Sequence, residues 1–466
     1  MLWDFAETNP FGGATGDFGV SLASVVNVVE RQAVTSLVVG RVEQRSAQTI
    51  APERSVVFST DPPYYDNVPY ADLSDFFYIW LRRSLSAVHP QLLGTVLVPK
   101  TEELVADPFR RGGRDEAKAY FEQGMAKVFE RMRRFSHVEF PTTIFYAFKQ
   151  SEDEDEDPLA DESTTSARGS TGWETFLQGL FDAGWQIDGT WPMRTERGVR
   201  TRSLGSNALA SSIVLVCRPR PDNASLATRK DFITALRREL PEALRNLQRG
   251  NIAPVDLAQA AIGPGMAVFT RFAKVIESNG TPMTVRTALG IINQSLDEVL
   301  AEQEGEFDSD TRWALAWFEQ FGMTEGPFGD AETLSKAKNT AVNGLVQAGI
   351  IVAQAGKVRL VKRDELPVDW NPATDKRLTA WEVTQHLIHR LDQQGELGAS
   401  TLVSKLGSVA EISRDLAYRL YSTCERKKWA QDALAYNSLV VAWPELRKLA
   451  LSSQNRQTST QQNLFN

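Results

Sequence analysis

Residues 56–67 read Val-Val-Phe-Ser-Thr-Asp-Pro-Pro-Tyr-Tyr-Asp-Asn, and this stretch predicts both a fold and a site. The run Val56–Phe58 is short, apolar and partly β-branched, as in a buried strand. Two consecutive prolines end a strand or a helix, so we expect the strand to stop before Pro62. A carboxylate, a rigid Pro-Pro step and an aromatic ring would then stand together at the end of that strand.

The segments around this strand predict an α/β fold with a Rossmann-like sheet, incomplete at its N-terminus, in residues 1–220. Their alternation along the chain favours a parallel sheet, in which ligands bind at the carboxyl ends of the strands. The last two strands are expected to form an antiparallel edge. The expected helices cover 18–34, 72–85, 115–134 and 173–183, and the further strands cover 142–148, 185–193 and 211–217.

After residue 220 the pattern becomes mainly helical. We expect a helical region at 221–320, with helices at 230–249, 284–304 and 311–321, then a helical and winged-helix-like region at 321–451, and a disordered polar tail at 452–466. The winged-helix interpretation depends on 330–361, where a helix from Asp330 to Ala348 precedes a hairpin centred on 355–357. A looser copy is predicted at 400–443, with its strand at 438–443.

Composition limits the class of protein. The chain has 466 residues, a net charge of −8 and two cysteines far apart, which argues against a disulfide framework and favours a reducing cytoplasm. His386 and His389 are three residues apart on an expected helix, but no Cys or carboxylate cluster joins them, so we expect no metal site. Apolar runs are too short to cross a membrane, and we expect no membrane partner.

The residues at the strand end suit chemistry on the amino group of a base. Such a nitrogen is a poor nucleophile unless acceptors hold its two hydrogens. Asp61 can supply one acceptor and the carbonyl of Pro62 the other, while Pro63 makes the pair rigid. Tyr64 can stack on a base that has left its duplex. The alternative is a strand-ending turn with a structural aromatic residue.

Six further residues are candidates for substrate binding. Tyr65 and Asn67 either shape the pocket or merely continue its loop. Arg110 and Arg111 flank a Gly-Gly pair, and Arg197 and Arg200 lie in a polar loop. All four arginines suit either phosphate contact or a solvated turn. The aromatic residues of 76–80 are expected in the core.

The tetrapeptide Asp61-Pro62-Pro63-Tyr64 resembles the catalytic motif of the DNA methyltransferases that modify amino groups. The stretches "WDFAETNPFG", "STDPPYYDNVPYADLSDFFYIWLRR" and "PKTEELVADPFR" are similar to the C-terminal half of a family of large adenine-specific DNA methylases. Those proteins are described as containing a zinc ribbon and belong to bacterial and archaeal defence islands. The resemblance implies S-adenosylmethionine as cofactor and DNA as partner. It favours adenine N6 over cytosine N4, because the motif begins with Asp.

The chain departs from this family in its cofactor loop. The family has a Gly-rich loop after its first strand, whereas the candidate here, "NPFGGATG" around Gly12, follows no apolar strand. Asp61 and Gly12 are the expected cofactor contacts. A separate polypeptide carrying the Gly-rich loop is a further expected partner, as are other defence-system proteins. Two alternatives stay open: a catalytically incomplete DNA-binding or assembly subunit, and methylation of RNA or of a protein amide.

Overall fold

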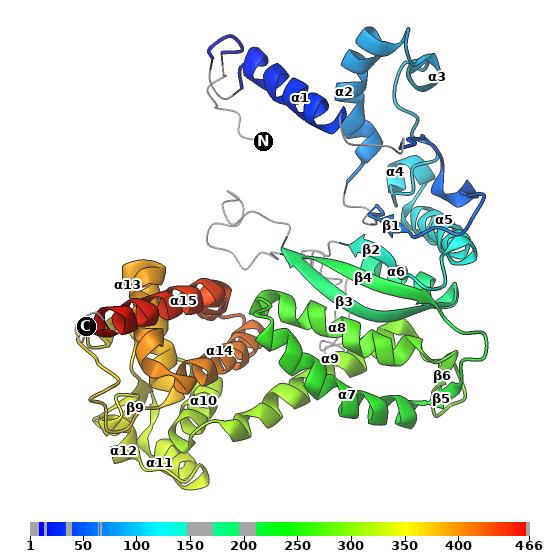
Figure 1. The fold of residues 1–466 in the computed structure, drawn as a ribbon. Helices are drawn as coiled ribbons and strands as arrows, with labels where there is room; N and C mark the ends of the chain where they lie inside the picture. The colour runs from blue at the N-terminus through cyan, green and yellow to red at the C-terminus, as the bar shows by residue number, and fades with distance from the viewer. Residues whose placement is uncertain are drawn as a thin grey trace.

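The computed structural model describes residues 9–13, 16–33, 40–63, 65, 68–146, 171–194 and 211–462. Its fold is α/β and has three parts: an N-terminal arm of helices, a small mixed sheet between helices, and a helical C-terminal region (Figure 1). None of the helices in the described ranges combines the length and the apolar character needed to cross a membrane.

The sheet has four strands in the order β1-β2-β4-β3. β1 runs parallel to β2, while β4 runs antiparallel to both β2 and β3. The sequence predicted β2, β3 and β4, and the antiparallel pair expected from the last two strands lies at one edge of the sheet, with β3 outermost and β4 inside. The buried strand expected at 56–58 is wrong in its bounds and its burial, because β1 begins at Ser59 and Val57 is exposed. All side chains of 213–217 are buried, which an interior strand allows and an exposed edge does not. The strands are β1 (Ser59–Thr60), β2 (Thr142–Tyr146), β3 (Trp185–Arg194) and β4 (Ser211–Pro219).

Helices cover both faces of this sheet. On one face lie α5 (Arg114–Phe135) and α6 (Thr171–Asp182), where the indole N–H of Trp185 donates to the Phe129 carbonyl at 3.0 Å. On the other face lies α8 (Pro254–Thr270), whose Ala260 carbonyl accepts from Thr190 Oγ1 at 2.9 Å. The sheet is thus the middle layer of a three-layer unit.

Gly263 permits the close approach of α8 to β3. A Cβ added at this position would overlap the side chain of Thr190, which is buried. We therefore expect Gly263→Ala to destabilise the fold by about 1–3 kcal/mol, measured by urea unfolding. Gly305→Ala is the control, because a Cβ there meets nothing within 4 Å. Equal midpoints for the two variants would contradict this packing.

The middle region contains α7 (Arg229–Arg249), α8 and α9 (Val285–Glu302). A capping box between Thr228 and Asp231 begins α7. The sequence predicted α7 and α9 but missed α8, because Pro264 lies inside it. A short parallel pair of strands, β5 (Leu226–Thr228) and β6 (Lys274–Ile276), lies beside these helices.

The next unit has the element order and strand pairing of a winged helix. α10 (Ser309–Phe321) is followed by β7 (Gly326–Pro327), two helices and a hairpin, and the sheet order is β7-β9-β8. The hairpin of β8 (Ile351–Gln354) and β9 (Lys357–Leu360) confirms the sequence prediction. The single helix predicted from Asp330 to Ala348 was wrong, because Asn339 has a positive φ of 56°. It divides that segment into α11 (Phe328–Ala337) and α12 (Val342–Gln347).

The C-terminal part consists of α13 (Ala380–Leu406), α14 (Ser408–Lys427) and α15 (Ala430–Gln462). The second winged-helix-like unit predicted at 400–443 is absent from this described part. Its expected strand lies within α15, because Tyr436, Leu439, Val440 and Trp443 share a buried helical face. The helix also continues into the tail that was expected to be disordered.

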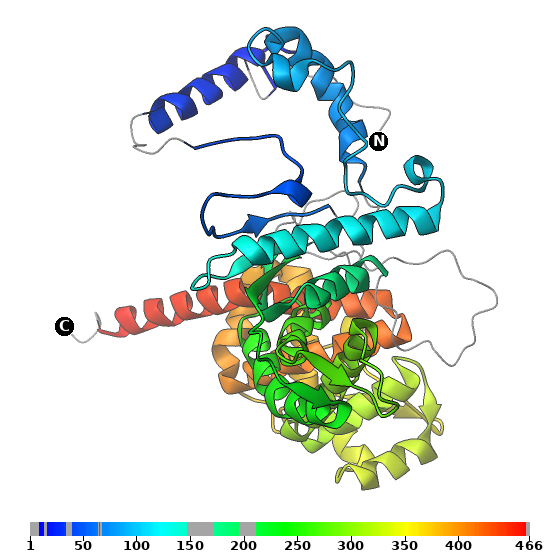
Figure 2. The ribbon, with the colours of Figure 1, turned by 90° about the vertical axis from the view of Figure 1, so that its right-hand side faces the viewer.

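The N-terminal arm extends beyond the β1 side of the sheet (Figures 1 and 2). It contains α1 (Phe18–Ala33), α2 (Tyr70–Leu85) and α3 (Pro90–Leu93), followed by α4 (Pro108–Arg111) next to α5. The sequence predicted α1 and α2. It wrongly placed the aromatic residues of 76–80 in the core, because only Tyr78 among them is buried.

Two buried ionisable side chains lie one turn apart on α13. Burial, with the nearby Asp375 carboxylate, raises the pKa of Glu382 to about 8. Burial also lowers the pKa of His386 to about 4, and its ring stacks on Trp370 with centroids 4.0 Å apart. Folding therefore favours the neutral form of both groups.

These shifts predict a pH dependence of stability. Between pH 6.5 and 8, His386 is neutral in both states, while Glu382 is protonated when folded and ionised when unfolded. The unfolded chain then binds fewer protons, so the free energy of unfolding falls as pH rises, by at most about 1.4 kcal/mol per pH unit. We expect Glu382→Gln to remove this slope and the exposed control Glu396→Gln to keep it. Identical slopes in chemical denaturation would contradict the assignment.

Candidate functional site

The site begins at the carboxyl end of β1. Thr60 pairs with Ile144 of β2, and Asp61 follows it immediately with an exposed side chain. Pro62 and Pro63 come next and are half-buried. The parallel pairing to β2 fixes the strand, and the two prolines fix the direction of the chain that leaves it. Asp61 therefore has a defined place at the strand end and is exposed there.

Tyr70, at the start of α2, lies beside this carboxylate. Burial first, and then the charges of Asp61 and Glu103, raise the pKa of the Tyr70 phenol. The phenol therefore keeps its proton at neutral pH and can donate it in a hydrogen bond. Sequence reasoning missed this residue. The signal available was its place nine residues after Asp61, within the stretch that resembles the methylase family.

Tyr65 anchors the loop that leaves the motif. Its φ is 54°, its carbonyl accepts from the Ala106 N–H at 3.0 Å, and its ring meets Phe121 edge-on at 5.2 Å. Gly172 allows α6 to begin against it, since an added Cβ would lie 2.9 Å from the Cβ of Tyr65. These contacts support packing instead of the predicted role in substrate binding, because the ring is already engaged inside the fold.

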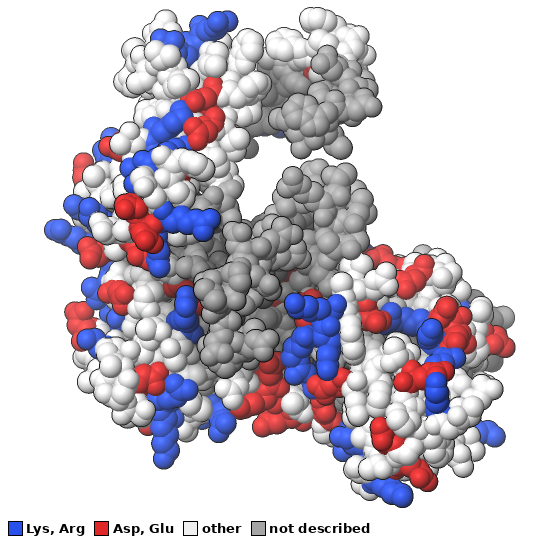
Figure 3. All heavy atoms as spheres, turned by 180° about the vertical axis from the view of Figure 1, so that it is seen from behind, with Lys and Arg blue, Asp and Glu red and all other residues white. Residues whose placement is uncertain are grey.

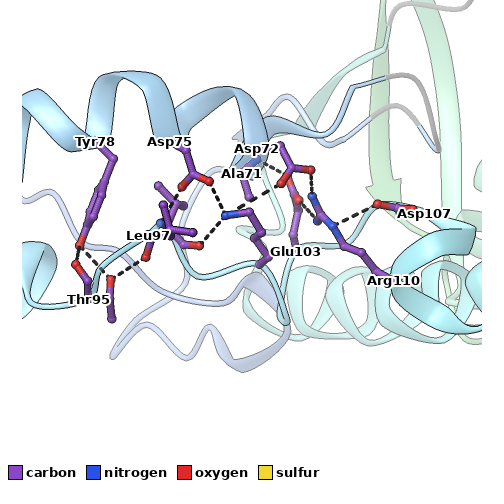
Figure 4. Close-up of polar contacts among 11 residues, drawn as sticks. Ala71, Asp72, Asp75, Tyr78, Thr95, Leu97, Glu103, Asp107 and Arg110 are labelled. Atoms are coloured by element: carbon purple, nitrogen blue, oxygen red, sulfur yellow. Dashed lines mark hydrogen bonds and ion pairs between the residues drawn. The ribbon is translucent and has the colours of Figure 1, made fainter.

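Arg110 does not serve as a free phosphate contact. Its guanidinium pairs with three carboxylates, those of Glu103 at 2.5 Å, Asp107 at 3.0 Å and Asp72 (Figure 4). Beside them, Lys100 Nζ pairs with Asp75 at 2.7 Å. These ion pairs favour a structural role for Arg110 over the predicted phosphate contact, because the surrounding carboxylates would repel a phosphate.

Arg111 is also occupied within its own loop. Its Nη2 donates to the Thr101 carbonyl at 2.6 Å, and its guanidinium carbon lies 3.4 Å from the ring centroid of Tyr120. The hydroxyl of Tyr120 donates to the same carbonyl at 3.0 Å. These contacts favour a structural role for Arg111 over the predicted phosphate contact, since its cation–π contact holds the segment 101–111 on α5.

Gly12 lies in a closed turn in front of α1. The turn is held by Asp17, whose carboxylate accepts from the N–H groups of Gly13 and Val20, each at 2.9 Å. The segment 9–13 lies at the end of α1 that is far from β1 (Figure 1). The predicted cofactor role of Gly12 is not supported, because its turn is satisfied by its own helix cap and lies away from Asp61.

Four predicted site residues lie outside the described residues: Tyr64, Asn67, Arg197 and Arg200. Among the residues that the structure does describe, no group of three or more His, Cys, Asp or Glu side chains is placed to hold a metal ion.

A hollow of about 320 Å³ lies elsewhere, between α7, the 3₁₀ turn Gln303–Glu306 and α14. Its charged side chains are largely paired: Arg245 with Glu306 at 3.1 Å, and Arg414 with Asp415 at 2.8 Å. Burial raises the pKa of Asp415. Sequence reasoning gave no signal for this hollow, which forms only where distant helices meet.

Comparison with known proteins gives one result. Residues 308–464 match a family model described as a domain of unknown function (DUF8807). No curated protein matches the chain, and no solved structure matches it. The matched range begins at the N-cap of α10 and includes the winged-helix-like unit and the three C-terminal helices.

The carboxylates around Arg110 predict what its loss would do. Arg110→Ala would leave Asp72, Glu103 and Asp107 close together without their shared cation, so we expect about 2–4 kcal/mol of destabilisation, confined to α2 and the loop behind it. Amide hydrogen exchange would show faster exchange in 70–85 while the sheet stays unchanged. The exposed neighbour Arg114 is the control, and equal effects of Arg114→Ala would contradict this role.

Proposed function

We propose that this chain is the catalytic-motif half of an S-adenosylmethionine-dependent DNA methyltransferase that modifies an amino group of a base, with adenine N6 favoured. The main support for this proposal is the position of Asp61, which is exposed and lies before two prolines at the carboxyl end of a parallel strand. The strand order supports it as well. A reversed strand between two parallel ones is the arrangement expected in the closing half of a Rossmann-like methyltransferase sheet, and β4 has that position.

In this proposal the chain positions the amino group. The Asp61 carboxylate accepts a hydrogen bond from one N–H of the extruded base, and the Pro62 carbonyl accepts from the other. This pairing favours a pyramidal nitrogen whose lone pair points away from both acceptors. The protonated Tyr70 phenol next to Asp61 can hold the carboxylate in place.

The described residues do not themselves make a site for S-adenosylmethionine. Such a site needs backbone N–H groups from a Gly-rich turn at a strand end. The turn around Gly12 lies away from Asp61 and is closed by Asp17. We therefore propose that the separate polypeptide expected from the sequence binds the methyl donor.

The proposal of DNA as the substrate depends on the motif Asp61-Pro62-Pro63-Tyr64. The charge distribution of the chain adds little support. On the face drawn in Figure 3, basic and acidic side chains lie among one another without a continuous basic stripe. Phosphate contacts then depend on parts other than Arg110 and Arg111. A role in phage defence follows from the family resemblance only.

A second candidate is a catalytically incomplete subunit that binds DNA or assembles defence proteins. The winged-helix-like unit favours it, because this architecture commonly binds DNA or protein partners. Some basic side chains of this unit, however, already form ion pairs within the protein. Arg359 pairs with Glu365 at 2.6 Å, and Lys357 pairs with Glu325 at 2.9 Å.

The proposal predicts that modified bases in host DNA depend on Asp61. Removing one preorganised hydrogen-bonding group from a site typically costs about 10²–10³-fold in rate. We expect Asp61→Ala, and Asp61→Asn with its unchanged size, to lower N6-methyladenine at the enzyme's sites by at least about 100-fold. Sequencing of native DNA from host cells measures this.

The control is the exposed Glu53→Gln, which lies before β1 and should leave methylation unchanged. Immunoblotting shows that each variant accumulates. If methylation survives Asp61→Ala, or if the wild-type gene adds no modified base, the proposed function is wrong.

A further inference from the structure

The arm displays an extensive apolar surface. Phe76, Phe77 and Trp80 on α2 are 66%, 65% and 60% exposed. One turn of helix thus presents three aromatic rings to solvent. Further exposed apolar side chains of the arm are Phe18, Leu22, Val25, Val26, Val28 and Val29 on α1, and Leu73, Ile79, Leu81, Val88, Leu92, Val96 and Leu97 around α2. Exposed apolar side chains in this number mark an interaction surface.

The arm is held in shape without its apolar face being covered. On its polar side, Asp75 accepts from Lys100 Nζ at 2.7 Å and from the Val98 N–H at 2.9 Å, and Glu103 accepts from the Ala71 N–H at 2.8 Å (Figure 4). The buried Tyr78 hydroxyl contacts Thr95 Oγ1 at 2.8 Å. These contacts orient α2 before any partner arrives, so little order has to be gained on binding.

Next to the arm, no other described strand pairs with the outer side of β1. Val56 and Phe58 pair toward the β2 side: the Val56 N–H donates to Phe135 O at 2.9 Å, and Phe58 O accepts from the Thr143 N–H at 3.0 Å. Because main-chain groups alternate along a parallel strand, those of Val57 and Ser59 point to the outer edge. β1 is last in the sheet order, and Val57 is 57% exposed.

We infer that the outer edge of β1 and the apolar face of the arm together form the docking surface for one partner polypeptide, which adds a strand beside residues 55–60 and covers α1 and α2. Strand addition satisfies the Val57 and Ser59 main chain, and an apolar partner surface covers the arm. The inference rests on the proposed function in one respect: the added strand would bring the cofactor loop to Asp61.

The main-chain groups at the outer edge of β1 indicate which class of partner binds this surface. A lipid surface would cover the apolar helices but cannot pair with main-chain N–H and C=O groups. Nucleic acid would meet a mainly apolar face, because α1 carries one arginine beside one glutamate and α2 carries Arg82 and Arg83 only in its last turn. Behind α2, Lys100 and Arg110 are paired with carboxylates. Only a polypeptide can satisfy both the edge and the helices.

The test begins with photo-crosslinking in the cells from which the chain comes. A photoreactive phenylalanine analogue is placed at position 57, 76 or 368 of the full chain. Val368 is the matched control, 69% exposed in the C-terminal part. We expect positions 57 and 76 to crosslink to the same polypeptide, different from this chain, and position 368 to give no such product.

The crosslinked polypeptide is then purified and its affinity for the chain measured. Phe76→Glu should weaken binding by at least 100-fold, and Val57→Pro, which removes one outward N–H, by at least tenfold. Leu397→Glu, at a site 68% exposed in α13, should leave it unchanged. Crosslinks to a second copy, to lipid, to nucleic acid or to two different polypeptides would overturn the inference, as would no crosslink or equal affinities.

Docking and function can fail separately. A complex that meets these criteria but binds no S-adenosylmethionine in calorimetry supports the docking surface and contradicts the proposed function. Cofactor binding and DNA methylation by this chain alone, without crosslinks at 57 and 76, would support the function and overturn the docking surface.

Discussion

The position of β4 determines the rest of this architecture. Because the last strand of the sheet runs back between β2 and β3, side chains on both of its faces become buried, and β3 closes one edge. The opposite edge is left to β1, a short strand held only by β2. The same arrangement that completes the core therefore leaves one side of the strand before Asp61 without a partner among the described strands, directly next to the proposed chemistry.

Outside the core, ion pairs determine how the helices of the N-terminal arm are oriented. The arm has few buried apolar side chains, and its helix α2 is oriented by carboxylates that share Arg110 and Lys100. Partly buried ion pairs of this kind specify orientation more than they add stability. This explains why an arm with such an exposed apolar face still has a defined helix direction. It also explains why two arginines that the sequence offered for phosphate binding are used inside the protein.

The sequence predicted those elements whose information is local. Apolar runs predicted β2, β3 and β4, and helical spacing predicted α1, α2, α7 and α9. The run 56–58 predicted a strand just before β1. Strand order is not local, since β4 enters the middle of the sheet through pairing with residues about 70 positions earlier in the chain, Thr142 and Thr143. The solvent exposure of a side chain also depends on residues far away in the sequence. The aromatic residues of α2 have the pattern of a core helix, and only the fold leaves their apolar face without cover. Asp61 was found because one tetrapeptide carries its chemistry, whereas Tyr70 required the geometry that brings α2 to the strand end.

In this architecture β1 is an edge strand that pairs with β2 alone among the described strands and ends immediately before Asp61. Residue-resolved amide hydrogen exchange on the isolated chain tests it most directly. Slow exchange of Val56 and Thr60, with fast exchange of Val57 and Ser59, is the alternation that the account predicts. Uniformly fast exchange from 55 to 60 would contradict the strand, and protection of Val57 and Ser59 in the chain alone would contradict its open edge.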